Sequence, residues 1–188
     1  PSTQEFDIDN RFNELESASS SAYLNFPDEV KYQNVDKIHT PLGLKGFFDY
    51  DEALEFAKNI ETEKPIFLDF TGLACENCRE MEHKVWSKPH IKKMLREQFI
   101  IVSLYVDHKY AIDEEDWVTD KKGRVQKTIG KKNISIEIDK YGNSAQPLYV
   151  VIDSDENILS EPIGKCSEKD FYNFLKTGLS NFYKTKSD

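Results

Sequence analysis

Two cysteines separated by two residues follow a short apolar segment, and this arrangement constrains the fold more than any other feature of the chain. Residues 66–70 read Ile-Phe-Leu-Asp-Phe, the nearly all-apolar composition of a buried parallel strand. After a short turn come Cys75 and Cys78, and from Cys78 to about Lys84 the residues are compatible with a helix. In the order strand, turn, C-x-x-C and helix, the cysteine pair predicts a redox motif rather than a chance pairing.

The segments on either side complete an alternation of helices and strands. Asp49 and Glu52 resemble a capping box, and the apolar residues after them fall at helical spacing until Pro65 ends the helix. A second helix over about 88–98 leads into an apolar strand over 99–106. The succession of strand, helix and strand predicts a βαβ unit with two parallel strands.

Two segments lie outside this regular alternation. Residues 1–40 carry eight Asp or Glu against three Lys or Arg, so we expect an acidic extension or linker there and place the folded domain at 41–188. Apolar residues in the extension leave open that part of it packs on the domain. Residues 107–145 are polar, weakly periodic and longer than a simple connection, so we expect an insertion with a short helix around 125–129.

The C-terminal part predicts a strand over 146–153, a turn over 154–157 and an antiparallel strand over 158–163. Ser167, with Asp170 three residues later, is expected to cap a last helix. Together these elements predict an α/β fold with a central mixed sheet flanked by helices.

Length and charge narrow the function classes. A chain of 188 residues is sufficient for one domain with a real core. The net charge of -9 argues against binding a phosphate backbone, and therefore against nucleic acid. The longest apolar run, 99–106, is far shorter than the roughly 20 residues that span a bilayer. No charged-then-apolar leader follows Pro1, so we expect any signal or membrane region to lie outside this sequence.

The cysteine pair predicts thiol–disulfide chemistry. Cys75 is placed at the start of a helix, where unpaired N–H groups and the helix dipole favour a thiolate, so it is the candidate nucleophile. Cys78, one turn further on, is placed to attack a mixed disulfide at Cys75 and release the reduced substrate. The two sulfurs carry the electrons themselves, so we expect no bound cofactor.

Other uses of the pair remain open. A structural disulfide is one alternative. A zinc site is another, although only His83 lies nearby and no second C-x-x-C or H-x-x-x-H supplies further ligands, so we predict no metal. A third is a metal-binding or chaperone module that holds a soft metal such as Cu(I). Cys166 stands alone before a helix and is expected to be a small structural residue.

Carboxylates near the cysteines predict how the site is tuned. Asp69 lies in an apolar strand, where partial desolvation raises its pKa and suits it to take the Cys78 proton; the alternative is an Asp at a strand end pointing to solvent. Glu82 follows one helical turn after Cys78, although an exposed position is common for a helix Glu. Because Glu76 and an ionised Asp69 disfavour a thiolate, we predict a reductase, and a reduction potential above about -150 mV would contradict this.

Pro147 opens a strand after Gln146, and this X-Pro bond is a candidate cis peptide. A loop there would face the cysteines, with backbone near Gln146 available to pair with an extended substrate. The alternative is an ordinary edge-strand proline.

Several motifs in order carry a family resemblance: Asp69-Phe-Thr-Gly-Leu-Ala-Cys-Glu-Asn-Cys-Arg-Glu-Met-Glu82, Val85-Trp-Ser87, Leu104-Tyr-Val-Asp107 and Ala145-Gln-Pro147. From about Gly46 to Leu179 the sequence resembles the C-terminal thioredoxin-like domain of the DsbD family of bacterial thiol:disulfide interchange proteins. The resemblance implies a thioredoxin-like fold and a periplasmic domain that takes electrons from a transmembrane donor domain. It also implies that the electrons reach periplasmic disulfide proteins, some of them in cytochrome c maturation. The alternative is that the chain is a free-standing reductase with no transmembrane domain attached.

Carried over by motif position, the resemblance assigns the nucleophile and resolving roles to Cys75 and Cys78, and it makes Pro147 the cis-proline. The carboxylates that tune the site are Asp69 and Glu82. We expect the substrate-binding positions to be Gln146, Pro147, Glu76 and Asn77. The chain departs from the family pattern in its polar, acidic Glu76-Asn77 pair, its long 107–145 segment and its acidic first forty residues.

Overall fold

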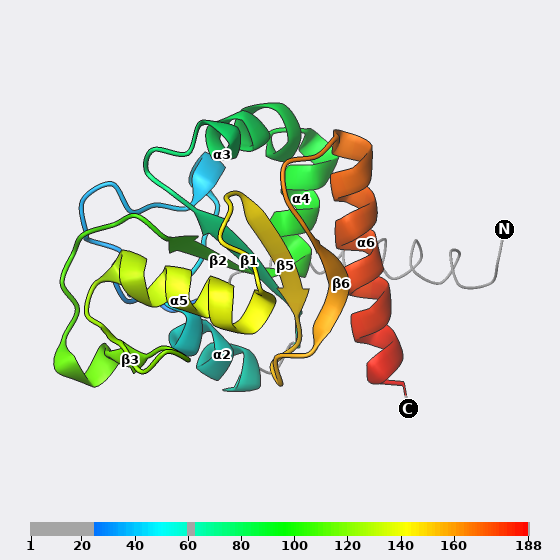
Figure 1. Ribbon diagram of the computed structural model, residues 1–188. Coiled ribbons are helices and arrows are strands. Elements are labelled where there is room, and N and C mark those ends of the chain that lie inside the picture. The colour runs from blue at the N-terminus through cyan, green and yellow to red at the C-terminus, as the bar shows by residue number, and fades with distance from the viewer. Residues whose placement is uncertain (1–24, 60–62, 188) are drawn as a thin grey trace, which may run out of the picture.

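A four-stranded mixed sheet forms the centre of the computed structural model, which describes residues 25–59 and 63–187 (Figure 1). The strands lie in the order β2-β1-β5-β6. Strands β1 and β2 are parallel, whereas β5 runs antiparallel to both of its neighbours, β1 and β6. The bounds are β1 Ile66–Thr71, β2 Ile100–Tyr105, β5 Leu148–Ile152 and β6 Ile158–Ile163. The predicted strands and the predicted α/β class are confirmed.

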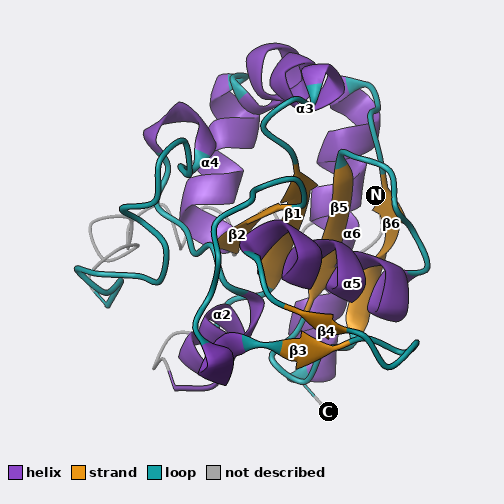
Figure 2. Cartoon of the chain, turned by 60° about the vertical axis from the view of Figure 1, so that its left-hand side comes forward, coloured by secondary structure: helices purple, strands orange, loops and turns teal. Residues whose placement is uncertain are grey.

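Helices cover both faces of this sheet. Helices α2 and α5 lie on one face, α4 and α6 on the other, and α3 lies at one end of the sheet (Figures 1 and 2). A π-helical turn, η3, continues α3 without a break. The bounds are α2 Tyr50–Asn59, α3 Glu76–Met81, η3 Glu82–Trp86, α4 Pro89–Gln98, α5 Ile129–Tyr141 and α6 Glu168–Thr185. Two short 3-10 helices are η2, Pro41–Gly43, and η4, Glu114–Asp116.

The two faces of β1 belong to two separate hydrophobic clusters. Successive side chains of a strand point to opposite faces, and Leu68 packs in the cluster under α2 and α5 while Phe67 packs in the cluster under α3, α4 and α6. Asp69 therefore shares the face of Phe67. Its neighbours across the sheet are Ser103 on β2 and Tyr149 on β5. The sheet thus directs the Asp69 carboxyl group towards the face covered by α3, α4 and α6, and the two cysteines lie at the start of α3.

The predicted helix caps are present. The Asp49 Oδ1 accepts a hydrogen bond from the Glu52 backbone N–H at 3.0 Å, and the Ser167 Oγ accepts one from Asp170 at 3.1 Å. The Glu52 carboxylate does not complete the capping box, because it accepts from the Lys31 N–H at 3.1 Å. The start of α2 is thus tied to Lys31, within the first forty residues.

The segment 107–145 differs from its prediction. The short helix expected around 125–129 is absent there, and Val125–Gln126 is strand β4, paired with β3 at Val118–Thr119. The helix of this segment is α5, which is thirteen residues long and lies between β2 and β5 in the chain. It crosses one face of the sheet (Figure 1). Its buried side includes polar residues, which hide the apolar period that would have revealed it. They are Lys132, Asn133, Ser135 and Glu137.

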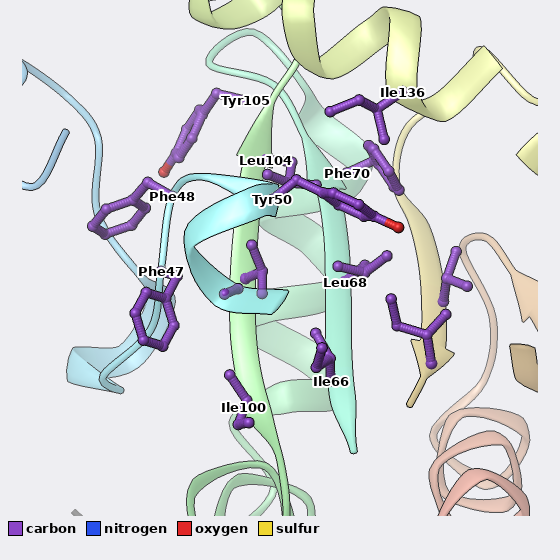
Figure 3. Packing of buried hydrophobic residues seen from close by; sticks show 14 of the residues in the cluster. Phe47, Phe48, Tyr50, Ile66, Leu68, Phe70, Ile100, Leu104, Tyr105 and Ile136 are labelled. Atoms are coloured by element: carbon purple, nitrogen blue, oxygen red, sulfur yellow. The ribbon is translucent and has the colours of Figure 1, made fainter. Parts of the chain in front are cut away.

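Residues before α2 pack against the sheet. Val30 and Ile38 are buried in the cluster under α2 and α5. Phe47 forms a parallel bridge to Val102 on β2, and Figure 3 shows Phe47, Phe48 and Tyr50 beside the strands. The described part of the acidic extension therefore contributes to the core, and the domain boundary at residue 40 remains a prediction. Residues 1–24 lie outside the described part of the chain.

Within residues 25–59 and 63–187, no helix combines the length and the apolar character needed to cross a membrane.

Candidate redox site

The two cysteines form a disulfide at the start of α3. Their Cα atoms are 5.2 Å apart, and Cys75 is the N-cap, its Sγ accepting a hydrogen bond from the Cys78 N–H at 3.2 Å. Cys75 is half-buried, whereas Cys78 is 1% exposed. An incoming thiolate or disulfide therefore meets Cys75 first. This asymmetry fits the predicted division into an outer nucleophile and an inner resolving thiol.

Asp107 holds the turn that presents Cys75. Its carboxylate accepts hydrogen bonds from the backbone N–H groups of Leu73 at 2.8 Å and Ala74 at 3.1 Å. A Cβ on Gly72 would meet an Asp107 carboxylate oxygen at 3.0 Å, so the glycine lets the turn approach this side chain closely. Sequence reasoning gave Asp107 no role of its own. The available signal is its position two residues after β2, at the end of the sheet where β1 also ends.

Asp69 is buried beneath the cysteine helix at 2% exposure. Burial raises the pKa of its carboxyl group to about 8, and the negative charge of Glu82 adds to this rise. Arg79 opposes the rise, and so does the Ser103 Oγ, which donates to Asp69 at 3.4 Å. The predicted desolvation and raised pKa are confirmed, and the alternative of an Asp pointing to solvent is wrong.

Glu82 is also nearly buried, at 9% exposure, instead of standing free on the helix. Burial raises its pKa, opposed most strongly by the Arg79 charge and then by His39 and His83. Arg79 lies 3.0 Å from the Glu82 Oε1, and the same guanidinium donates to the Thr71 Oγ1 at 2.8 Å. Arg79 thus links the helix carboxylate to β1. Sequence reasoning missed it, although its spacing of three residues before Glu82 is a signal for such a pair.

A surface groove of about 500 Å³ lies beside Cys75. The Gln146-Pro147 peptide is cis, as predicted. Gln146 lines the groove, whereas Pro147 is buried next to it. The lining residues are Gly72, Ala74, Cys75, Glu76, Asn77, Val106, Asp107 and Gln146. Three of the four predicted substrate-binding residues therefore border the reactive cysteine, and their binding role remains a prediction.

A family model described as thioredoxin-like matches residues 45–154. The chain belongs to the thioredoxin-like family. With the Cys75–Cys78 disulfide in a C-x-x-C motif, this membership supports thiol–disulfide oxidoreductase activity in general. Among curated proteins, none matches the chain significantly.

The chain is similar to several solved structures. A structure titled DsbH oxidoreductase has 22% identity and a TM-score of 0.52, over 76% of this chain and 91% of its own. A thioredoxin from Thermus thermophilus has 18% identity and a TM-score of 0.49, over 70% and 84%. The reduced C-terminal domain of Neisseria meningitidis DsbD has 19% identity and a TM-score of 0.45, over 68% and 92%. At these identities the likeness to the DsbH structure establishes the thioredoxin-like fold alone.

This thioredoxin-like domain carries two further groups near the motif. Lys165, in the loop after β6, donates to the Asn77 Oδ1 at 3.2 Å and forms an ion pair with Glu80. Cys166 is half-buried with a free thiol and packs against the cluster under α6, and burial raises its pKa to about 11. A thiol with so high a pKa is a poor nucleophile, in keeping with the predicted structural role.

In the described ranges, no cluster of three or more His, Cys, Asp or Glu side chains is arranged to hold a metal ion.

Proposed function

We propose that this domain is a protein-disulfide reductase that transfers two electrons through Cys75 and Cys78. The observation that carries the proposal is a half-buried outer cysteine beside a groove, paired with a buried inner cysteine. The helical segment of the inner cysteine also carries Arg79 and Glu82, whose charges act on the buried Asp69. A carboxyl group with a pKa of about 8 is suited to exchange a proton at neutral pH.

The reaction begins with the reduced dithiol. The Cys75 thiolate attacks a substrate disulfide, a Cys75–substrate disulfide forms, and the first substrate sulfur leaves and takes up a proton. Cys78 then loses its proton to the Asp69 carboxylate and attacks the Cys75 sulfur, which releases the second substrate sulfur as a thiol once it is protonated. The substrate has gained two electrons and two protons, and the domain has become the disulfide.

The direction of electron flow follows from local charge. Negative charge near the cysteines disfavours the thiolate and therefore the reduced dithiol, which makes that dithiol the better electron donor. Glu82 and the groove residue Glu76 are the carboxyl groups in question, and Asp69 adds to them in its ionised form. A domain of this kind functions as a reductase.

The equilibrium reduction potential tests the direction. In a glutathione or dithiothreitol series, we expect a potential near or below about -200 mV. Cys166→Ala is the matched control, because it removes the third thiol and leaves the motif intact. A value above about -150 mV, or a pair that never titrates, would overturn the assignment as a reductase.

We further propose that the domain works in the periplasm, receiving electrons from a membrane-embedded thiol donor and passing them to disulfide proteins, including proteins of cytochrome c maturation. The support is the resemblance of its motifs, in order, to the C-terminal domain of the DsbD family. A Cys78→Ala variant expressed in the periplasm should accumulate mixed disulfides, whose partners mass spectrometry identifies. Partners confined to cytoplasmic proteins after full-cell expression, or stoichiometric Cu(I) bound to the cysteines, would contradict this placement.

A further inference from the structure

Glu137 is a buried carboxyl group that contacts Gln146, a residue of the groove lining. Glu137, on α5, is 0% exposed, and its Oε2 accepts a hydrogen bond of 2.8 Å from the Gln146 Nε2. Within the described residues its Oε1 is buried without a hydrogen-bond partner. A buried carboxyl group with an unsatisfied oxygen destabilises a fold, so its presence calls for an explanation other than stability.

The partner of Glu137 is the groove residue that precedes the cis-proline. The Gln146 Nε2 makes a second hydrogen bond, to the Ser144 carbonyl at 3.1 Å. Both amide hydrogens therefore point to acceptors inside the protein. Because a carboxylate and a carbonyl only accept, the two contacts fix which way the amide faces. The side-chain oxygen of Gln146 is the polar atom left for the groove.

Several residues that line the groove beside Cys75 carry hydrogen-bond acceptors. It contains the Gln146 side chain and the Glu76 carboxylate, and the Asp107 carboxylate already takes two N–H groups of the protein's own backbone. A ligand that fits such a lining donates hydrogen bonds. An extended polypeptide does so through its backbone N–H groups, whereas a small aliphatic disulfide has no such donor.

We propose that Glu137 is a positioning residue that orients the Gln146 amide so that the groove accepts a backbone N–H of an extended polypeptide next to the disulfide under attack. The inference rests on the proposed reductase function and adds to it a residue that positions the groove side chain Gln146. Glu137 touches neither cysteine in this account and acts through Gln146 alone.

The test compares two substrates in the full chain. Insulin supplies a polypeptide disulfide, and diethyl disulfide supplies one without any N–H or O–H donor. For Glu137→Leu we expect a roughly five- to tenfold higher KM for insulin at unchanged kcat, because one hydrogen-bonding arrangement is lost. The rate with the small disulfide and the reduction potential should stay within twofold and within a few millivolts of the parent.

Further variants make the result specific. Glu137→Gln keeps an acceptor for the Gln146 amide and should restore the insulin KM to within about twofold of the parent. Gln146→Leu, at a partly exposed loop position, should raise the KM as much as Glu137→Leu, and the double variant should add nothing further. Glu55→Leu makes the same chemical change at an exposed helical position outside the groove lining and should change nothing.

Specific outcomes overturn the inference. A folded Glu137→Leu with the parent KM for insulin contradicts it, and so does a Glu137→Gln variant as impaired as Glu137→Leu. If Glu137→Leu does not fold, Gln146→Leu decides, and an unchanged KM contradicts the inference. If the parent reduces the small disulfide and is no faster with insulin, the preference for polypeptides is refuted. The inference then fails, while thiol–disulfide exchange at the two cysteines stands. A parent that reduces neither substrate refutes the proposed function as well.

Discussion

Arg79 pairs with Glu82 at 3.0 Å on the segment that carries the redox cysteines. The same guanidinium reaches β1 through the Thr71 hydroxyl at 2.8 Å, so one side chain fastens the cysteine helix to the strand that holds Asp69. Its positive charge lowers the pKa of both carboxyl groups, whereas the negative charge of Glu82 raises the pKa of Asp69. Burial thus raises the pKa of Asp69, and these two neighbours on the helix adjust it in opposite directions.

Replacing Glu82 by Gln should shift that balance. With the negative charge removed, the pKa of Asp69 should fall below about 8, and an infrared or NMR titration of the Asp69 carboxyl group measures the change. Glu161→Gln, at an exposed position on β6, is the matched control. An Asp69 pKa that rises in Glu82→Gln would show that the Arg79 contact matters more than the repulsion.

Replacing Asp69 by Asn should slow resolution of the mixed disulfide. Loss of a positioned base costs about 10²-fold or more in such steps. Because the group acts as a base only when ionised, the parent rate should increase with pH through about 8, and the variant should lack this inflection. Stopped-flow measurements of the Cys75–substrate disulfide follow the step directly. Equal rates and equal pH profiles would remove Asp69 from the mechanism.

The same substitution should change the pH dependence of stability. The folded-state pKa of Asp69 is about 8 against an ordinary value of 3.8, so the native state binds the extra proton between these pH values. The stability conferred by that proton is complete below pH 3.8 and disappears as the pH rises through 8. The unfolding free energy of the oxidised parent, measured in urea, should therefore decline relative to Asp69→Asn from pH 4 to pH 8. A constant difference between the two proteins would contradict the assigned pKa.

Asp107→Ala should loosen the turn before Cys75. Two backbone N–H groups lose a charged acceptor, so we expect a loss of about 1–3 kcal/mol in the free energy of unfolding. The Cys75 turn should also exchange amide hydrogens faster at Leu73 and Ala74. Asp113→Ala, at an exposed site in the next loop, serves as the control. Unchanged exchange at these two amides would mean that the turn holds its shape without Asp107.

Local patterns in the sequence predict the frame of the site. The apolar run of β1, the C-x-x-C and the caps at Asp49 and Ser167 each depend on residues close together in the chain, and the structure contains all of them. Even the burial of Asp69 follows from its apolar neighbours.

Contacts between distant residues escape the same reasoning. Asp107 meets the turn 33 and 34 residues earlier, and no local period reveals such a contact. Helix α5 is hard to predict because its buried side includes Lys132, whose ammonium group pairs at 2.8 Å with Asp49, the residue just before α2. Charged residues are usually exposed, so sequence patterns predict a surface position even for a charged side chain that is buried with a partner. Glu137 is missed for the same reason, since its partner Gln146 lies in the next loop.

The bridge formed by Phe47 covers part of the edge of the sheet. The outer side of β2 is an edge of the sheet, and an edge with unpaired backbone groups is a template for another strand. The Phe47 N–H donates to the Ile101 carbonyl at 2.8 Å, and the Ser103 N–H donates to the Phe47 carbonyl at 2.9 Å. A domain cut after residue 47 would expose these two groups in the middle of the strand. The short segment before α2 therefore acts as a built-in guard against edge-to-edge aggregation.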